Sequence, residues 1–145
     1  MTRHPGLPQP LRLALALLVL LALGACALTP RFASLEARII AGTPLELPRN
    51  AELNVTLREG SASGGVIAEG NYTRLSRGPI PVVLRYDANA VTAGRDYVLR
   101  AEIRADGRLL YASPEPVAVL TDDTAAGSGK VPVEVRVEPV AASLR

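Results

Sequence analysis

The residues from 97 to 113, YVLRAEIRADGRLLYAS, restrict the fold of this chain more than any other segment. Apolar and polar residues alternate over 97–103, which is the period of a strand with one buried face. Ala105-Asp106-Gly107 then predicts a three-residue hairpin loop in which Gly107 adopts a positive φ. A hairpin with one apolar face is not stable by itself in water, so other strands must cover that face.

The register of this hairpin follows from keeping both apolar sets on one side. We predict that Arg104 pairs with Arg108, although this places two like charges beside the turn. Ala101 then lies opposite Tyr111. In this register Leu110 points outward and is a candidate contact residue for a partner protein, although a single exposed leucine is also ordinary on a protein surface.

Six further segments show the alternation or the β-branched composition of strands. They are residues 37–41, 52–58, 66–73, 80–86, 117–120 and 131–138. Pro79 and Pro81 indicate that the strand at 80–86 lies at a sheet edge, because proline has no N–H for a second ladder. Asp87 predicts a capped helical turn after that strand. About seven or eight short strands at this spacing predict an all-β fold, an antiparallel β-sandwich.

The N-terminal segment has the composition of a lipoprotein signal peptide. The apolar run from Leu13 to Leu23 follows Arg12 and is too short for a bilayer span, which needs about 20 residues. Leu23-Gly24-Ala25-Cys26 has the pattern of a lipobox, in which the first three residues are recognised by the signal peptidase. Cys26 would then carry the acyl lipid and become the new N-terminus. The alternative is an ordinary secretory signal with a chance cysteine.

This interpretation divides the chain into a signal peptide (1–25), an acylated tether (26–36), a β-sandwich domain (37–140) and a C-terminal tail (141–145). A helix near 33–38 in the tether would be too short to be stable alone. Ala27 stands where lipoproteins retained in the inner membrane carry aspartate. By that analogy the protein is expected in the outer membrane, facing the periplasm.

The charge balance gives no support to a nucleic-acid-binding role. The chain carries 16 basic and 14 acidic residues. The predicted leader contains two of the basic residues and none of the acidic ones, so the mature chain is formally neutral. The basic excess of the full chain is therefore no evidence for nucleic-acid binding.

The mature chain also lacks the side chains that most catalytic and metal sites use. Its only histidine, His4, leaves with the leader, and its only cysteine would be acylated. These losses exclude Ser-His-Asp and Cys-His catalysis and His-ligated zinc. Asp122-Asp123 could act as paired carboxylates, but they lie in a loop where water should keep both ionised. Residues 127–130 in the same loop do not have the spacing of a phosphate-binding loop. We therefore predict no enzymatic activity, no metal and no cofactor apart from the covalent lipid on Cys26.

The strand Leu84-Arg85-Tyr86-Asp87 and the hairpin from Asp96 to Ser113 resemble the YbaY-like lipoproteins and the YscW-type lipoprotein chaperones of type III secretion. In that family a strand of pattern pY.LpyD precedes a hairpin of pattern Y.l.A.I..dG.L.y.s. The resemblance covers the chain from about Ala37 to Val140. It implies a pilotin-like role, in which the protein helps an outer-membrane secretin to reach or assemble in its membrane.

The residues and this resemblance together predict a monomeric outer-membrane lipoprotein that binds an envelope or secretion-system protein. The alternative is a structural or ligand-binding envelope lipoprotein, for example one that contacts polysaccharide. Exposed tyrosines would favour the alternative, whereas an open strand edge or an apolar groove would favour the chaperone. Three of the four tyrosines fall at inward positions of predicted strands and are expected in the core.

Overall fold

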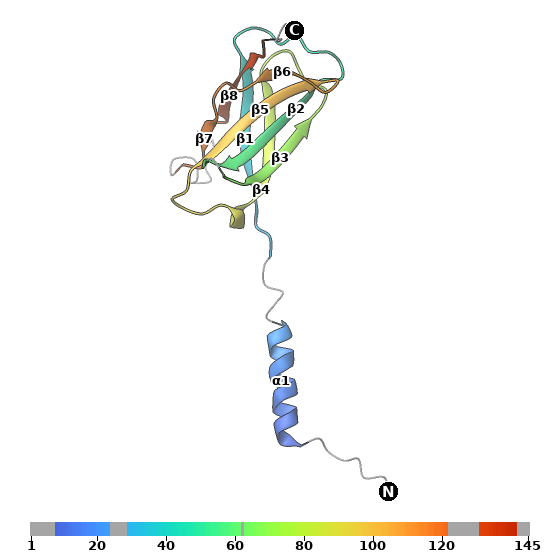
Figure 1. Cartoon of the computed structure of the whole chain (residues 1–145), viewed down its shortest axis with the longest axis vertical. Coiled ribbons are helices and arrows are strands. Elements are labelled where there is room, and N and C mark those ends of the chain that lie inside the picture. The colour runs from blue at the N-terminus through green and yellow to red at the C-terminus, as the bar shows by residue number, and fades with distance from the viewer. Residues whose placement is uncertain (1–7, 24–28, 62, 122–130, 142–145) are drawn as a thin grey trace. The chain divides into compact units, whose positions relative to one another are not determined.

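The computed structural model describes residues 8–23, 29–61, 63–121 and 131–141 (Figure 1). The chain divides into two units, Met1–Pro30 and Arg31–Arg145. In the first unit the described residues form the helix α1 (Gln9–Leu23), which contains the apolar run of the predicted leader. None of the helices in the described ranges combines the length and the apolarity that a membrane span requires.

The second unit is all-β, which confirms the predicted fold class. Its strands are β1 (Phe32–Ala41), β2 (Glu52–Glu59), β3 (Val66–Tyr72), β4 (Ile80–Asp87), β5 (Tyr97–Ala105), β6 (Arg108–Ala112), β7 (Val117–Val119) and β8 (Val133–Pro139). The 3-10 helix η2 (Ala88–Ala90) follows β4. The carboxylate of Asp87 accepts a hydrogen bond from the backbone N–H of Asn89 (2.9 Å), which confirms the predicted capped turn.

The described strands form one eight-stranded sheet in the order β3-β2-β5-β6-β8-β1-β4, with β7 paired to β5. The pairs are antiparallel except for β1 and β8, which are parallel, a pairing that an all-antiparallel sandwich does not include. The sheet curls until its end strands, β3 and β4, contact each other without a backbone ladder between them (Figure 1). The hydroxyl of Tyr72 on β3 donates across this seam to the carbonyl oxygen of Val83 on β4 (2.7 Å). The domain is therefore a nearly closed barrel.

The first strand begins earlier than the sequence predicts. β1 starts at Phe32 rather than at Ala37, and residues 33–38 are extended instead of helical. The ladder with β4, from Phe32↔Asp87 to Ile39↔Ile80, gives these residues backbone partners. Tertiary pairing of this kind outweighs a weak local preference for a short helix.

The turn of the central hairpin is shorter than the sequence predicts. Asp106 and Gly107 form the turn with φ values of 51° and 74°, and Ala105 pairs with Arg108. Two central residues with positive φ give a type I′ turn, whose twist matches the twist of the flanking strands. The predicted pairing of Arg104 with Arg108 is therefore wrong.

A β-bulge follows the turn. Arg104 pairs with Leu109, but Ile103 pairs with Tyr111, so Leu110 is the extra residue on β6. The side chain of Leu110 is half-buried and packs on the core. The outward orientation that we predicted for Leu110 is therefore wrong, because the bulge rotates the strand at this residue.

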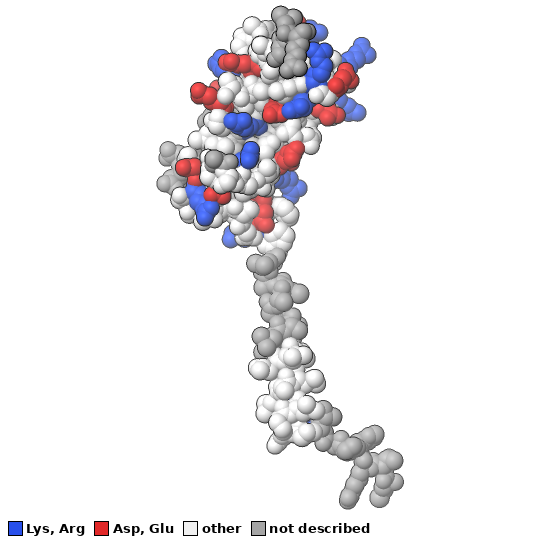
Figure 2. Space-filling view, viewed as in Figure 1, with Lys and Arg blue, Asp and Glu red and all other residues white. Residues whose placement is uncertain are grey.

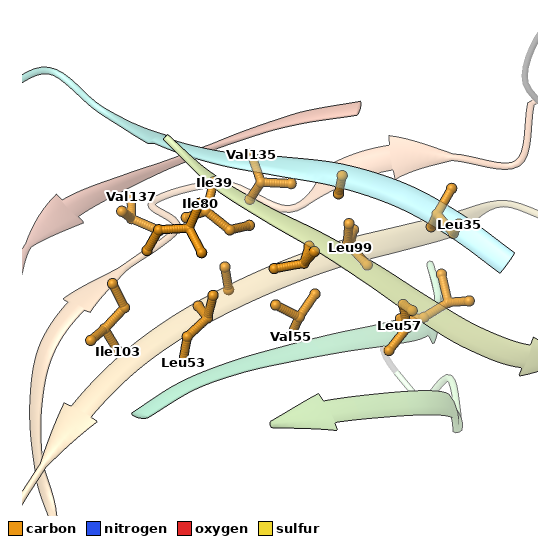
Figure 3. Close-up of a cluster of buried hydrophobic side chains, with 14 of the residues drawn as sticks. Leu35, Ile39, Leu53, Val55, Leu57, Ile80, Leu99, Ile103, Val135 and Val137 are labelled. Carbon is orange, nitrogen blue, oxygen red and sulfur yellow. The ribbon is translucent and has the colours of Figure 1, made fainter. Parts of the chain in front are cut away.

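The core fills the inside of the curled sheet (Figure 3). Inward side chains alternate along each strand; Leu53, Val55 and Leu57 on β2, for example, are fully buried. Each aliphatic side chain buried in this way contributes about 1.5–3 kcal/mol to the free energy of unfolding. The buried core residues all lie between Leu35 and Val137, so the core is built within the second unit.

Candidate functional site

A pocket of about 430 Å³ opens at the end of the barrel where β1 ends and β4 begins. Its lining comes from two segments that are far apart in the sequence. They are residues 40–45 (IAGTPL) and 77–79 (RGP). Sequence reasoning placed both segments beside predicted strands but did not identify them as a site.

The pocket forms where the ladder between β1 and β4 stops. The last pair is Ile39 with Ile80, and the preceding residue, Pro79, has no N–H with which to extend the ladder. Beyond this pair the backbone N–H of Leu45 donates to the carbonyl oxygen of Arg77 (3.0 Å) and joins the two lining segments. Leu45 is buried, so the loop after β1 is held on the core.

The lining is mostly apolar, with cationic groups beside it. Thr43 and Arg77 are its polar side chains. A Cβ built on Gly42 would lie 3.9 Å from Nη1 of Arg136, which places a second guanidinium next to the lining. Within the described residues neither arginine forms an ion pair. The pocket therefore suits an apolar segment that carries a carboxylate, because a guanidinium binds a carboxylate through two parallel hydrogen bonds.

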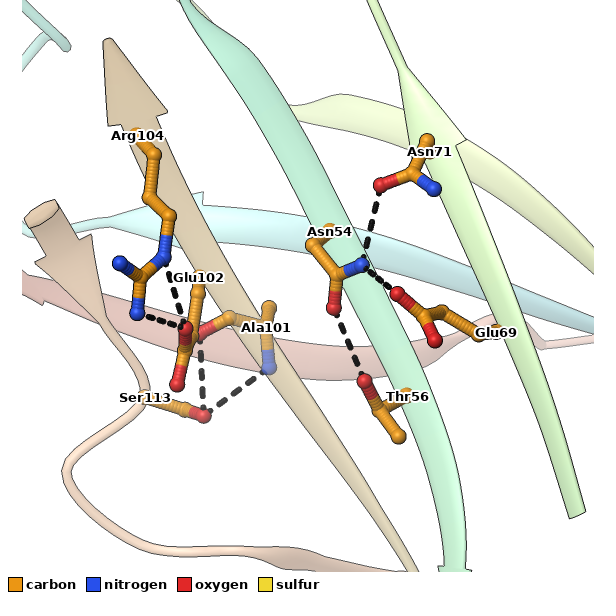
Figure 4. A network of polar contacts seen from close by, with 8 residues as sticks. All are labelled: Asn54, Thr56, Glu69, Asn71, Ala101, Glu102, Arg104 and Ser113. Atoms are coloured by element: carbon orange, nitrogen blue, oxygen red, sulfur yellow. Dashed lines mark hydrogen bonds and ion pairs between the residues drawn. The ribbon is translucent and has the colours of Figure 1, made fainter. Parts of the chain in front are cut away.

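The outer face of β2 and β3 carries a polar network whose members bind one another (Figure 4). Nδ2 of Asn54 donates to Oδ1 of Asn71 (2.9 Å) and to Oε1 of Glu69. Oδ1 of Asn54 in turn accepts from Oγ1 of Thr56 (2.9 Å). Positive and negative side chains are interspersed over the face of the domain seen in Figure 2. The network on β2 and β3 supports the two strands through cross-strand pairs. The charged side chains of the face in Figure 2 form no single-sign patch for a charged ligand.

All four tyrosines contact the core, as the sequence predicts for three of them. Tyr97 is buried, and its hydroxyl oxygen accepts a hydrogen bond from the backbone N–H of Thr92 (2.7 Å). Tyr72, Tyr86 and Tyr111 are half-buried against the same core. Burial raises the pKa of both Tyr72 and Tyr86, and the hydrogen bond across the seam offsets part of the rise in the pKa of Tyr72.

The residues predicted for lipid attachment fall mostly outside the described ranges. Gly24-Ala25-Cys26 lies outside them, as does the acidic and glycine-rich stretch 122–130, and Leu23 is the last residue of α1. Leu110 is described but is not part of the pocket lining, and its role as a partner contact stays a prediction. Among the described residues, no three His, Cys, Asp or Glu side chains are grouped so that they could hold a metal ion.

Comparison with known proteins identifies a family and a similar fold. The family described as type III secretion system lipoprotein chaperone (YscW) matches residues 31–129. No curated protein is similar enough to this chain to count as a match. A solved structure, an alternative pilotin from the type II secretion system of Vibrio cholerae, superimposes with a TM-score of 0.62 and 24% identity, covering 76% of this chain and 100% of that chain. This likeness supports the fold.

Proposed function

Because this chain belongs to the type III secretion system lipoprotein chaperone (YscW) family, we propose that it acts as a pilotin-like chaperone for a secretin. In this proposal the protein is anchored in the outer membrane through a lipid on Cys26, faces the periplasm, and binds its client without catalysing a reaction. The observation that carries the proposal is the family match over residues 31–129, which includes β1 to β7 and both segments of the pocket.

We take the pocket as the client-binding site. It lies at the C-terminal end of β1, a strand of 10 residues. At about 3.3 Å per residue the strand places the pocket about 30 Å from Phe32, where the tether joins the barrel. A lipid on Cys26 would hold the Phe32 end near the membrane, so the pocket would face the periplasm and a client there. The apolar lining beside two arginines favours a client segment with apolar side chains and a carboxylate.

A polysaccharide-binding role has less support. Its distinguishing feature would be tyrosines exposed as stacking platforms, and the four tyrosines of this chain are buried or half-buried in the core. No observation therefore favours this second function over the chaperone.

Two glycine substitutions test the pocket with a matched control. A Cβ built on Gly78 or on Gly65 meets no atom within 4 Å, and neither glycine has a φ in the left-handed region. Gly78→Glu therefore places a carboxylate at the pocket lining without distorting the fold. Gly65→Glu adds the same group in the loop between β2 and β3, at the opposite end of the barrel.

The assay measures how much of the secretin reaches the outer membrane in cells that lack this protein. The inner and outer membranes are separated on a density gradient, and each variant is supplied at matched expression. We expect the wild-type chain and Gly65→Glu to restore the secretin to the outer membrane. Gly78→Glu should fail because its carboxylate repels the acidic client segment. Cys26→Ser should fail as well, with loss of lipid labelling and an uncleaved precursor.

Three outcomes would count against this account. A secretin that reaches the outer membrane equally with and without the protein would refute the chaperone role. Full restoration by Gly78→Glu would refute the pocket as the client site. If crosslinking in intact envelopes recovered only glycan and no protein partner, the polysaccharide-binding alternative would replace the proposal.

A further inference from the structure

The end of the barrel opposite the pocket combines an exposed aromatic ring, two arginines and a loop without charges. Phe32 is 66% exposed, and the guanidinium carbon of Arg85 lies 5.5 Å from the centre of its ring. Residues 88–94 (ANAVTAG) contain no charged side chain. The backbone N–H of Ala88 donates to the carbonyl oxygen of Arg31 (2.6 Å), which holds this loop beside the start of β1. We call residues 31, 32, 85 and 88–94 the β1-start surface.

We propose that the β1-start surface lies directly on the membrane, with the ring of Phe32 among the lipid headgroups and the two arginines against lipid phosphates. This inference rests on the lipid at Cys26 that the proposed function includes. Cys26 and Phe32 are separated by six steps along the chain. Even a fully extended tether therefore keeps the ring within about 20 Å of the acylated residue.

The chemistry of the surface fits a bilayer interface. Aromatic side chains collect at the headgroup level of membranes. Arginine can rest its aliphatic stem on apolar surface while its guanidinium reaches anionic phosphate. Asp87, which pairs with Phe32 in the ladder, is a carboxylate beside the surface and accepts the backbone N–H of Asn89 (2.9 Å). The chain has one phenylalanine and no tryptophan, and this phenylalanine is left outside the core at the point where the tether enters.

A membrane contact at this end has a consequence for the client site. The tether alone allows the domain to rotate about its attachment point, because a short linker fixes distance but not orientation. Contact through the β1-start surface adds a second point of attachment and so fixes the orientation. The pocket at the other end of β1 is then directed away from the bilayer.

The absence of tryptophan makes the surface measurable with a single reporter. Phe32→Trp places a fluorophore at the proposed contact. Val140→Trp is the control, because Val140 is also exposed and follows β8, whose parallel pairing with β1 puts it at the opposite end of the barrel. Each lipidated chain is reconstituted into phosphatidylethanolamine–phosphatidylglycerol vesicles, with or without bromine on the acyl chains.

We expect the Phe32→Trp emission to shift to shorter wavelength in vesicles and to lose most of its intensity when the acyl chains are brominated. Val140→Trp should show neither change. Adding Arg85→Glu to Phe32→Trp should reduce the quenching, because anionic headgroups repel the new carboxylate. Equal quenching of the two reporters, or no quenching of either, would overturn the proposal. A shift for Phe32→Trp that appears without lipid and grows with protein concentration would assign the surface to a second copy of the chain instead.

The same experiment separates this inference from the proposed anchor. Mass measurement of the N-terminal peptide reports whether Cys26 is acylated in cells, and an unmodified cysteine would refute the anchor. In that case the chain 26–145, in which Cys26 is the only cysteine, can be coupled through its thiol to a maleimide phospholipid. Quenching of the Phe32→Trp reporter in this coupled chain would support the membrane contact, and lack of quenching would refute it, whether or not Cys26 is acylated in cells.

Discussion

Ser113→Ala should destabilise the domain because it leaves one buried backbone N–H, that of Ala101, without a hydrogen-bond acceptor. Ser113 is the buried residue directly after β6, and its Oγ accepts a hydrogen bond from the backbone N–H of Ala101 on β5 (3.0 Å). Oγ also donates to the carbonyl oxygen of Ala101 (3.3 Å), which in addition accepts the backbone N–H of Ser113 (2.9 Å). The side chain thus continues the β5 ladder between the end of β6 and the start of β7.

The magnitude follows from which partners are lost. In Ser113→Ala the carbonyl oxygen of Ala101 keeps the backbone N–H of Ser113, so it stays bonded. The N–H of Ala101 loses its partner at a buried position. An orphaned buried donor costs about 1–3 kcal/mol. For a domain of this size, each kcal/mol lowers the melting temperature by about 4 °C or more.

The assay is urea denaturation followed by circular dichroism, with the midpoint and the slope fitted separately. We expect a lower midpoint and an unchanged slope, since the surface exposed on unfolding stays the same. Ser76→Ala is the control: Ser76 is exposed and its Oγ makes only a long contact to Gly78 (3.5 Å), so its effect should stay within about 0.5 kcal/mol. Equal effects of the two substitutions would refute the role assigned to the Ser113 hydroxyl.

Two further predictions concern the turn and the seam. Gly107→Val should lower the free energy of unfolding by about 1–3 kcal/mol, because the φ of Gly107 is 74° and a β-branched side chain is strained there. Gly107→Asn should lower it by less, and equal losses for the two variants in urea denaturation would contradict this reasoning. Burial raises the pKa of Tyr72 and Tyr86 above the usual value of 10.0, so the neutral phenols favour the folded state; their stabilisation should be complete below pH 10 and fall as the pH rises above it. Urea midpoints at pH 8 and pH 11 should therefore differ more for the wild type than for a Tyr72→Phe, Tyr86→Phe double variant, and identical differences would rule out this linkage.

Several features of this fold are determined by residues that are close together in the sequence. The alternation of Leu53, Val55 and Leu57 indicates which face of the strand is buried, and this signal does not depend on which strand lies next to it. The capped turn at Asp87 depends on a contact two residues along the chain, and for this reason its prediction is confirmed. The hairpin at Gly107 also depends on neighbouring residues and is predicted correctly, but its loop has two residues instead of the predicted three. Asp106 and Gly107 both accept positive φ, so the composition suits a two-residue turn as well as a three-residue loop.

The partners of each strand were decided only by tertiary structure. Alternation marks an inward face but carries no information about which strand lies next to it, and the parallel pairing of β1 with β8 has no sequence signal. The pocket depends on the same long-range choice. Residues 40–45 and 77–79 lie close together because β1 and β4 pair as antiparallel neighbours. The pocket opens between them because Pro79 cannot continue the ladder. The sequence shows the proline and the loops, but only the long-range antiparallel pairing of β1 with β4 brings the two loops together.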